Sequence, residues 1–339
     1  MRSKSLLLLA LVASTAAIAQ PRAEKPWVAP GTPGSEIDGT IFHAQVLLAT
    51  AGFSPGVIDG KDGMSFKAAI RGFQQSRGLE PTGKLDGKTR RALLEQDRPS
   101  TVHVKLGPGD ISGDYVYPMP RDYEDQAKLP GLKYRNMLEE VAERYHTTPR
   151  AIIALNGPKA LIGIGQTLRL PNIIPVSRDY RGDLKDEHRS LMAKLNVEAR
   201  VPRGEYIIVD RSEGQLKVMD ASDRLVAQFP VTTGSQYDPL PLGNWKVTTF
   251  AFLPPFHYQP DLFWDVEDSK DDQMLPAGPN SPVGVAWLDL SKEHYGIHGT
   301  SEPQNIGRTE SHGCLRLTNW DVLRLSQMMK PGFKAEFRA

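Results

Sequence analysis

The sequence is poor in several features that would point to particular classes of protein. It has a single cysteine, Cys314, among 339 residues, and a lone cysteine cannot form an intramolecular disulfide, which excludes a disulfide-stapled scaffold. No stretch approaches the ~20 consecutive apolar residues of a membrane-spanning helix. The formal net charge is only +1, so no overall positive field attracts nucleic acid.

The N-terminus has the pattern of an export signal. Arg2 and Lys4 precede a short apolar run at 6–13, and the small residues of 17–19 form an A-x-A cleavage site. We therefore expect a signal peptide at 1–19, cleavage after Ala19 and an exported protein. Residues 20–35 are rich in proline and glycine and are predicted to be a flexible spacer.

The only cysteine lies in a glycine-rich stretch, 295–316, together with His298 and His312. A buried thiol can simply pack as a small hydrophobe. A thiol beside an imidazole can instead be a nucleophile with its base. A strand carrying His298, an excursion through Gly299, and a return at Cys314 would bring the two side chains together.

The residues around the cysteine suggest how a reaction could be assisted. Gly313 allows a turn in which its own amide and that of Cys314 point to one spot, as in an oxyanion hole. A helix predicted to start near residue 318 is expected to lower the thiol pKa.

A metal site is the alternative use of these side chains. Its ligands would be a histidine and cysteine set: His298, His312, Cys314 and His294. The two-residue separation of His312 and Cys314 is poor ligand spacing for zinc, so we expect neither a metal nor a cofactor.

The rest of the chain divides by composition and periodicity. Residues 36–97 predict a small module of three helices, and 98–177 a connector followed by a small α/β module. Residues 178–201 predict a charged linker formed by a solvated helix that joins the modules. From 202 to 339 the period changes to two, which predicts a mainly-β domain resembling a β-sandwich. Within it, the aromatic-rich segment 250–273 is a candidate lid. The fold class is thus multidomain α+β.

The motifs of the last segment resemble one family closely. HGT at 298–300, IG at 306–307 and SHGCLR at 311–316 resemble the signature of the L,D-transpeptidase (YkuD-type) catalytic domain. The likeness extends upstream through YIIVDRSEGQLKVM, PVTTG and PLGNWKV.

Two upstream segments resemble cell-wall modules. GFSPGVIDGKDG and FKAAIRGFQQSRGLEPTGKLDGKTRRAL, within 36–97, resemble the peptidoglycan-binding type 1 domain; packing against the catalytic unit is the alternative role. LEEVAERYHTTPRAIIALN and IGIGQTLRLPN, within 98–177, resemble a LysM module, which binds glycans containing N-acetylglucosamine. Its first strand is not evident in the sequence, and a spacer without a ligand is the alternative.

The first resemblance implies a cysteine-dependent acyl transfer. Cys314 attacks the carbonyl of the third stem residue of peptidoglycan, typically diaminopimelate, releases D-alanine and passes the acyl group to an amine. The roles implied for the other site residues are a base, His298; its orienting carbonyl, Gly299; a lining side chain, His312; oxyanion amides, Gly313 and Cys314; an ordered turn, Ser311; and substrate contacts, Arg316 and Thr300.

Two other functions remain open at the level of sequence. Water as the acceptor would make the protein an L,D-carboxypeptidase, and loss of activity would leave a non-catalytic wall-binding protein. The expected partners are stem peptides and glycan strands, with an outer-membrane lipoprotein as one potential acceptor, and no nucleic acid. Arg316, in place of the asparagine of other members, and the diaminopimelate substrate favour the periplasm.

Overall fold

The computed structural model describes residues 26–264, 266 and 271–339. The predicted export signal lies outside these residues. None of the described helices combines the length and the apolar character needed to cross a membrane.

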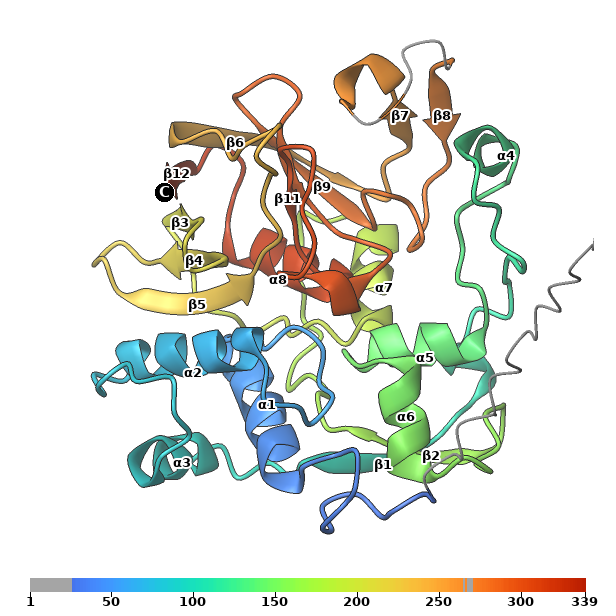
Figure 1. The fold of residues 1–339 in the computed structure, drawn as a ribbon, viewed down its shortest axis with the longest axis vertical. Coiled ribbons are helices and arrows are strands. Elements are labelled where there is room, and N and C mark those ends of the chain that lie inside the picture. The colour runs from blue at the N-terminus through green and yellow to red at the C-terminus, as the bar shows by residue number, and fades with distance from the viewer. Residues whose placement is uncertain (1–25, 265, 267–270) are drawn as a thin grey trace, which may run out of the picture.

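The C-terminal part is built on one eight-stranded sheet, in the order β11-β10-β9-β6-β12-β3-β4-β5 (Figure 1). Its strands are β3 (Tyr206–Asp210), β4 (Gln215–Met219), β5 (Leu225–Pro230), β6 (Gly243–Phe252), β9 (Ala286–Leu290), β10 (Gly296–His298), β11 (Leu315–Arg316) and β12 (Lys334–Arg338). Just beyond β5, Thr232 exchanges two backbone hydrogen bonds of 3.0 Å with Arg316 of β11. The sheet therefore curls until its two edges meet, so the mainly-β prediction is confirmed but two stacked sheets are not formed.

The interior of the curled sheet follows from its period-two pattern. Ile207 and Val209 of β3, for example, are fully buried. Helix α8 (Asn319–Met328) packs into the same core, and its first turn is capped by the Thr318 side chain, which accepts from Asp321 N. In Figure 1 this helix lies between the sheet and the N-terminal helices.

The predicted three-helix module is present as α1 (Gly39–Ala51), α2 (Met64–Ser76) and α3 (Gly87–Leu94). Asp38 and Asp86 cap α1 and α3 with their carboxylates. Gly52 ends α1 in the left-handed conformation, with φ of 97°.

This module is docked on the sheet and is not separated from it by a linker. Gln228 of β5 accepts from Ser54 N (2.8 Å), donates its own N–H to Gly52 O (3.0 Å), and donates its side-chain amide to Ala68 O of α2 (2.8 Å). Met219 and Leu225 of the sheet share the apolar core of the module. The module therefore packs against the C-terminal domain, which was the alternative role considered from the sequence. This packing leaves open a second role in contacting the cell wall.

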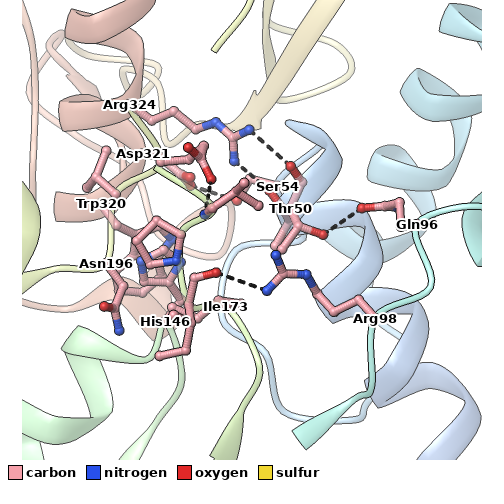
Figure 2. Close-up of a pocket in the computed structure, with 16 residues that line it drawn as sticks. Thr50, Ser54, Gln96, Arg98, His146, Ile173, Asn196, Trp320, Asp321 and Arg324 are labelled. Atoms are coloured by element: carbon pink, nitrogen blue, oxygen red, sulfur yellow. Dashed lines mark hydrogen bonds between the residues drawn. The ribbon is translucent and has the colours of Figure 1, made fainter. Parts of the chain in front are cut away.

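A cluster of polar side chains joins α8 to both upstream modules (Figure 2). The Ser54 hydroxyl donates to the Asp321 carboxylate (2.7 Å), and Arg324 donates to the carbonyls of Ala49 (2.5 Å) and Thr50 (3.3 Å). On the other side of a cavity of about 230 Å³, the His146 ring stacks on Trp320, with centroids 4.7 Å apart. These contacts fix both modules against one helix.

Residues 98–177 contain two strands around two helices. β1 (Thr101–Lys105) pairs antiparallel with β2 (Thr167–Pro171), and α5 (Met137–Arg144) and α6 (Pro149–Asn156) lie between them in the chain. The first strand escaped the sequence analysis because a long insertion with η1 (Pro108–Asp110) and α4 (Tyr123–Ala127) separates it from α5. The LysM resemblance of this segment stays a prediction.

The helix expected in the charged linker at 178–201 is present, but the segment is not solvated along its whole length. This segment forms α7 (Asp186–Lys194), and its apolar side chains Met192, Leu195 and Val197 are buried in the core of the sheet domain. The Tyr180 hydroxyl also donates to Val197 O (2.9 Å). The high charge of the segment hid this buried face because only the exposed side of α7 is charged.

Docking of the three-helix module predicts a sensitive position at Gly72 of α2. A Cβ there would lie 2.5 Å from the Gln228 side chain, so we expect Gly72→Leu to lower the free energy of unfolding by about 1–3 kcal/mol through overpacking. Gly87→Ala, where a Cβ meets no atom within 4 Å, is the control. Urea unfolding that shows no loss for Gly72→Leu relative to the control would contradict the docked arrangement.

Candidate active site

The pairing of β10 with β11 places the two predicted catalytic residues on one face of the sheet. The strands are parallel, and Ile297 is in register with Leu315. Both of these side chains are fully buried in the core. Because side chains alternate along a strand, His298 lies on the opposite face together with Cys314 and Arg316, which flank Leu315. The excursion that the sequence predicted between the strands contains η3 (Pro303–Asn305).

His298 has the tautomer that a base requires. Its Nδ1 lies 2.7 Å from the carbonyl oxygen of Gly299 and must donate to it, which leaves Nε2 as a proton acceptor. Trp287 stacks on the ring, with centroids 5.2 Å apart and planes 12° apart. Burial, followed by the positive charge of Arg316, lowers the imidazole pKa to about 3. His298 is therefore neutral.

Cys314 is a partly exposed thiol that is protonated at rest. Its Sγ donates to the carbonyl oxygen of His294, at 3.6 Å. Desolvation raises the thiol pKa to about 11, although the Gly296 backbone hydrogen bond and the Arg316 charge act in the opposite direction. Helix α8 begins at Asn319, close to the predicted position, but the thiol pKa is raised and not lowered as expected, because desolvation is its largest cause.

The turn before the cysteine depends on glycine. Gly313 has φ of 91°, and a Cβ at this position would lie 2.6 Å from the ring of Tyr295. The Ser311 hydroxyl donates to the carbonyl of Cys314 (2.6 Å) and closes the turn. Within the described residues, neither the Gly313 nor the Cys314 amide donates to a backbone carbonyl. Both N–H groups are thus available to another acceptor.

The two predicted substrate contacts differ in their surroundings. Arg316 is half-buried, and its charge acts on both Cys314 and His298. Thr300 is buried, and its hydroxyl accepts from Glu302 N (3.1 Å). Arg316 is therefore the better placed of the two to meet a ligand beside the thiol.

An aromatic hairpin lies against His312. It contains β7 (Phe256–Tyr258), η2 (Pro260–Leu262) and β8 (Gln273–Leu275). The rings of Phe263 and Trp264 lie 4.8 and 6.1 Å from the His312 ring. The proposed insertion begins later than expected, since 250–252 belong to β6.

The hairpin also borders a cavity that is lined by Trp287, which stacks on His298, and by His294, whose carbonyl accepts from Cys314. Its volume is about 260 Å³, and Phe256, Leu262, Trp287 and His294 are among its lining residues. Tyr123 of α4 packs edge-on against Tyr258 of β7, with centroids 4.6 Å apart. The insertion at 106–136 therefore supports the hairpin, as Figure 1 shows at the upper right.

Two residues of the site, Trp287 and Asn319, were not predicted from the sequence. Trp287 had no motif to mark it. Asn319 lies at the predicted start of the helix, where Thr318 is the residue that provides the cap. Its side-chain oxygen accepts from two backbone amides, Val285 N and Thr300 N, each at 3.1 Å.

The protonation states can be measured directly, because the chain has one cysteine. We expect ultraviolet thiolate absorbance, with Cys314→Ser as the tyrosine background, to report an apparent thiol pKa of about 11. Arg316→Gln removes a cation that lowers this pKa, so the midpoint moves further upward. A thiolate that is already formed near neutral pH would contradict a resting state in which the Cys314 thiol and the His298 imidazole are both uncharged.

Comparison with known families assigns two segments. Residues 204–336 match the model described as "L,D-transpeptidase catalytic domain", and 39–93 match "Putative peptidoglycan binding domain".

Individual relatives give the same description. The chain is 28% identical over 206 residues to "Putative L,D-transpeptidase YkuD" of Bacillus licheniformis, a match that covers 59% of this chain and 93% of the relative. It is 39% identical over 137 residues to "Probable L,D-transpeptidase YbiS" of Escherichia coli K12, covering 39% of this chain and 44% of that one.

Among solved structures, the L,D-transpeptidase of Xylanimonas cellulosilytica (residues 123–326) aligns with 94% of this chain and 100% of its own, at 14% identity and a TM-score of 0.36. The matched segments, with the single cysteine inside the catalytic one, support a cysteine-dependent L,D-transpeptidase that carries a peptidoglycan-binding module.

Proposed function

We propose that this protein is an exported enzyme that transfers acyl groups between peptidoglycan stem peptides, with Cys314 as its nucleophile. The observation that carries the proposal is the juxtaposition of the thiol with a neutral histidine whose Nδ1 is already occupied by Gly299. With its proton on Nδ1, His298 can accept a proton only at Nε2. Its side chain lies on the same face of the sheet as that of Cys314.

The charge states favour proton transfer during attack over a preformed thiolate. The thiol pKa is raised to about 11 and the imidazole pKa is lowered to about 3, so an ion pair at rest is unfavourable. As the sulfur bonds to the carbonyl carbon of the third stem residue, Nε2 of His298 takes the thiol proton. The resulting oxyanion meets the amides of Gly313 and Cys314, each worth ~3 kcal/mol in such sites.

Collapse of this intermediate breaks the carbon–nitrogen bond to D-alanine, and the His298 imidazolium protonates the departing amine. An acceptor amine then attacks the thioester, His298 takes its proton, and the thiol is restored. Arg316 is suited to a stem carboxylate, because its charge lies beside the thiol. Thr300 supports the loop after His298, and His312 with the aromatic hairpin lines the approach to the thiol.

The hairpin bears on the choice of acceptor. Phe263 and Trp264 lie beside His312, with Trp264 54% exposed. Apolar side chains that close over a thioester would exclude water and so favour an amine acceptor over hydrolysis. We therefore place transpeptidation ahead of L,D-carboxypeptidase activity. Both a second stem peptide and a lysine of an outer-membrane lipoprotein are compatible with this chemistry.

The upstream modules fit the same substrate. We infer that 36–97 contacts peptidoglycan, supported by its family match, and that 98–177 contacts glycan if its LysM resemblance holds. The location that follows is outside the cytoplasm, and for a diaminopimelate substrate with Arg316 we propose the periplasm.

Product analysis tests this function. Protein lacking 1–19 is incubated with a disaccharide-tetrapeptide donor, with and without amine acceptors, and products are identified by mass spectrometry. We expect crosslinked or amine-exchanged products that require Cys314. His298→Gln should lower kcat by about 10²- to 10⁴-fold, as expected for loss of a general base.

The matched control is His103→Gln, at an exposed position of β1. Its activity should equal that of the parent protein. Tripeptide monomers without dimers would indicate the carboxypeptidase, whereas turnover that survives Cys314→Ala would refute the proposed nucleophile.

A further inference from the structure

One peptide unit connects the catalytic histidine to the rest of the protein. The peptide group between Gly299 and Thr300 accepts from His298 Nδ1 through its carbonyl (2.7 Å) and donates through its N–H to Asn319 Oδ1 (3.1 Å). Because the peptide group is planar and rigid, the orientation of its carbonyl is set by the bond on its other side. Asn319 therefore sets the orientation of the Gly299 carbonyl, which is the acceptor for His298 Nδ1.

Asn319 is itself fixed at every polar atom. The residue is fully buried, and its oxygen also accepts from Val285 N (3.1 Å). Its amide nitrogen donates to Glu143 Oε1 (2.6 Å) and Pro279 O (3.3 Å). With two donors at one end and two acceptors at the other, the side-chain amide has one satisfactory orientation.

The backbone around Asn319 leaves room for this side chain. A Cβ at Gly284 or at Gly299 would lie 2.0 Å from Asn319 Oδ1. The absence of side chains at both positions lets the amide oxygen reach two backbone N–H groups on neighbouring loops. Asn319 thus links the loop before β9 to the loop after β10.

The last partner comes from a different part of the chain. Glu143 belongs to α5, in the 98–177 segment, and is almost completely buried. Burial raises its carboxyl pKa to about 7. In Figure 1, α5 lies below α8, on the side away from the hairpin. Glu143 Oε1 accepts from the Asn319 amide, whereas Oε2 has no hydrogen-bond partner among the described residues. Hydrogen bonding to Tyr134 and Asn319 acts against the effect of burial on the carboxyl pKa.

We propose that Glu143 and Asn319 are positioning residues for His298, so that the 98–177 segment completes the active site. The chain of contacts runs from the Glu143 carboxyl through the Asn319 amide and the 299–300 peptide to the imidazole. This inference rests on the proposed function for its turnover test, but the orientation of His298 can be read without any donor substrate.

Two substitutions at Glu143 separate the effect of side-chain length from the effect of charge. Glu143→Gln keeps the length and an acceptor oxygen, whereas Glu143→Asp keeps the charge and withdraws the oxygen by one methylene. We expect kcat to stay within about threefold for Gln and to fall by about 10- to 100-fold for Asp, by analogy with partners that orient metal-binding histidines. KM should be unchanged in both.

The control is Glu140, a neighbouring buried carboxylate of α5 that accepts from Ser112 N and from the Tyr115 hydroxyl. Glu140→Asp disturbs the same helix without touching the contacts to His298. It should leave kcat unchanged at an equal loss of thermal stability. An equal loss of kcat in Glu140→Asp and Glu143→Asp would overturn the proposal. A loss of kcat in Glu143→Gln with none in Glu143→Asp would do the same.

A substrate-free readout distinguishes this proposal from the proposed function. The pH dependence of Cys314 alkylation by iodoacetamide, followed by intact mass, should differ from the parent in Glu143→Asp and match it in Glu143→Gln. Should no donor be turned over by any protein, the proposed function fails, while an altered alkylation profile in Glu143→Asp alone still supports positioning. Identical profiles in all variants would contradict it.

Discussion

The pairing of β10 with β11 is the interaction on which the structure of the site depends. It sets the register that puts Ile297 and Leu315 into the core and leaves His298 and Cys314 on the opposite face. A slip of one residue would exchange the two faces and bury the thiol in the apolar interior. Closure of the sheet through Thr232 and Arg316 opposes such a slip, because β11 is hydrogen-bonded on both sides.

Helix α8 connects this pair of strands to the remainder of the chain. Asp321 and Arg324 contact the three-helix module through Ser54 and the end of α1. Trp320 stacks on His146, and Asn319 meets Glu143. Segments that resemble independent wall-binding modules therefore also brace the catalytic domain.

The sequence predicted the parts of the protein that depend on local patterns. The three helices, the mainly-β domain and the bond between His298 and Gly299 follow from periodicity, capping residues and motif resemblance. The buried face of α7 and strand β1 were not predictable, since Met192 and the strand's partner are defined only by distant segments.

Charge states were the other failure of prediction from sequence. The direction of the Cys314 pKa depends on burial by residues far away in the chain, and a nearby helix start alone suggested the opposite direction. Asn319 was missed for the same reason, because its partners Glu143, Val285 and Thr300 come from three separate segments.

The most direct test of the central claim is the intact mass of the protein after brief exposure to a tetrapeptide donor without an acceptor. A Cys314 nucleophile predicts a covalent adduct equal to the donor less D-alanine, which peptide mapping places on Cys314 and hydroxylamine removes. Absence of any adduct while D-alanine is released, or an adduct that persists in Cys314→Ala, would contradict the account.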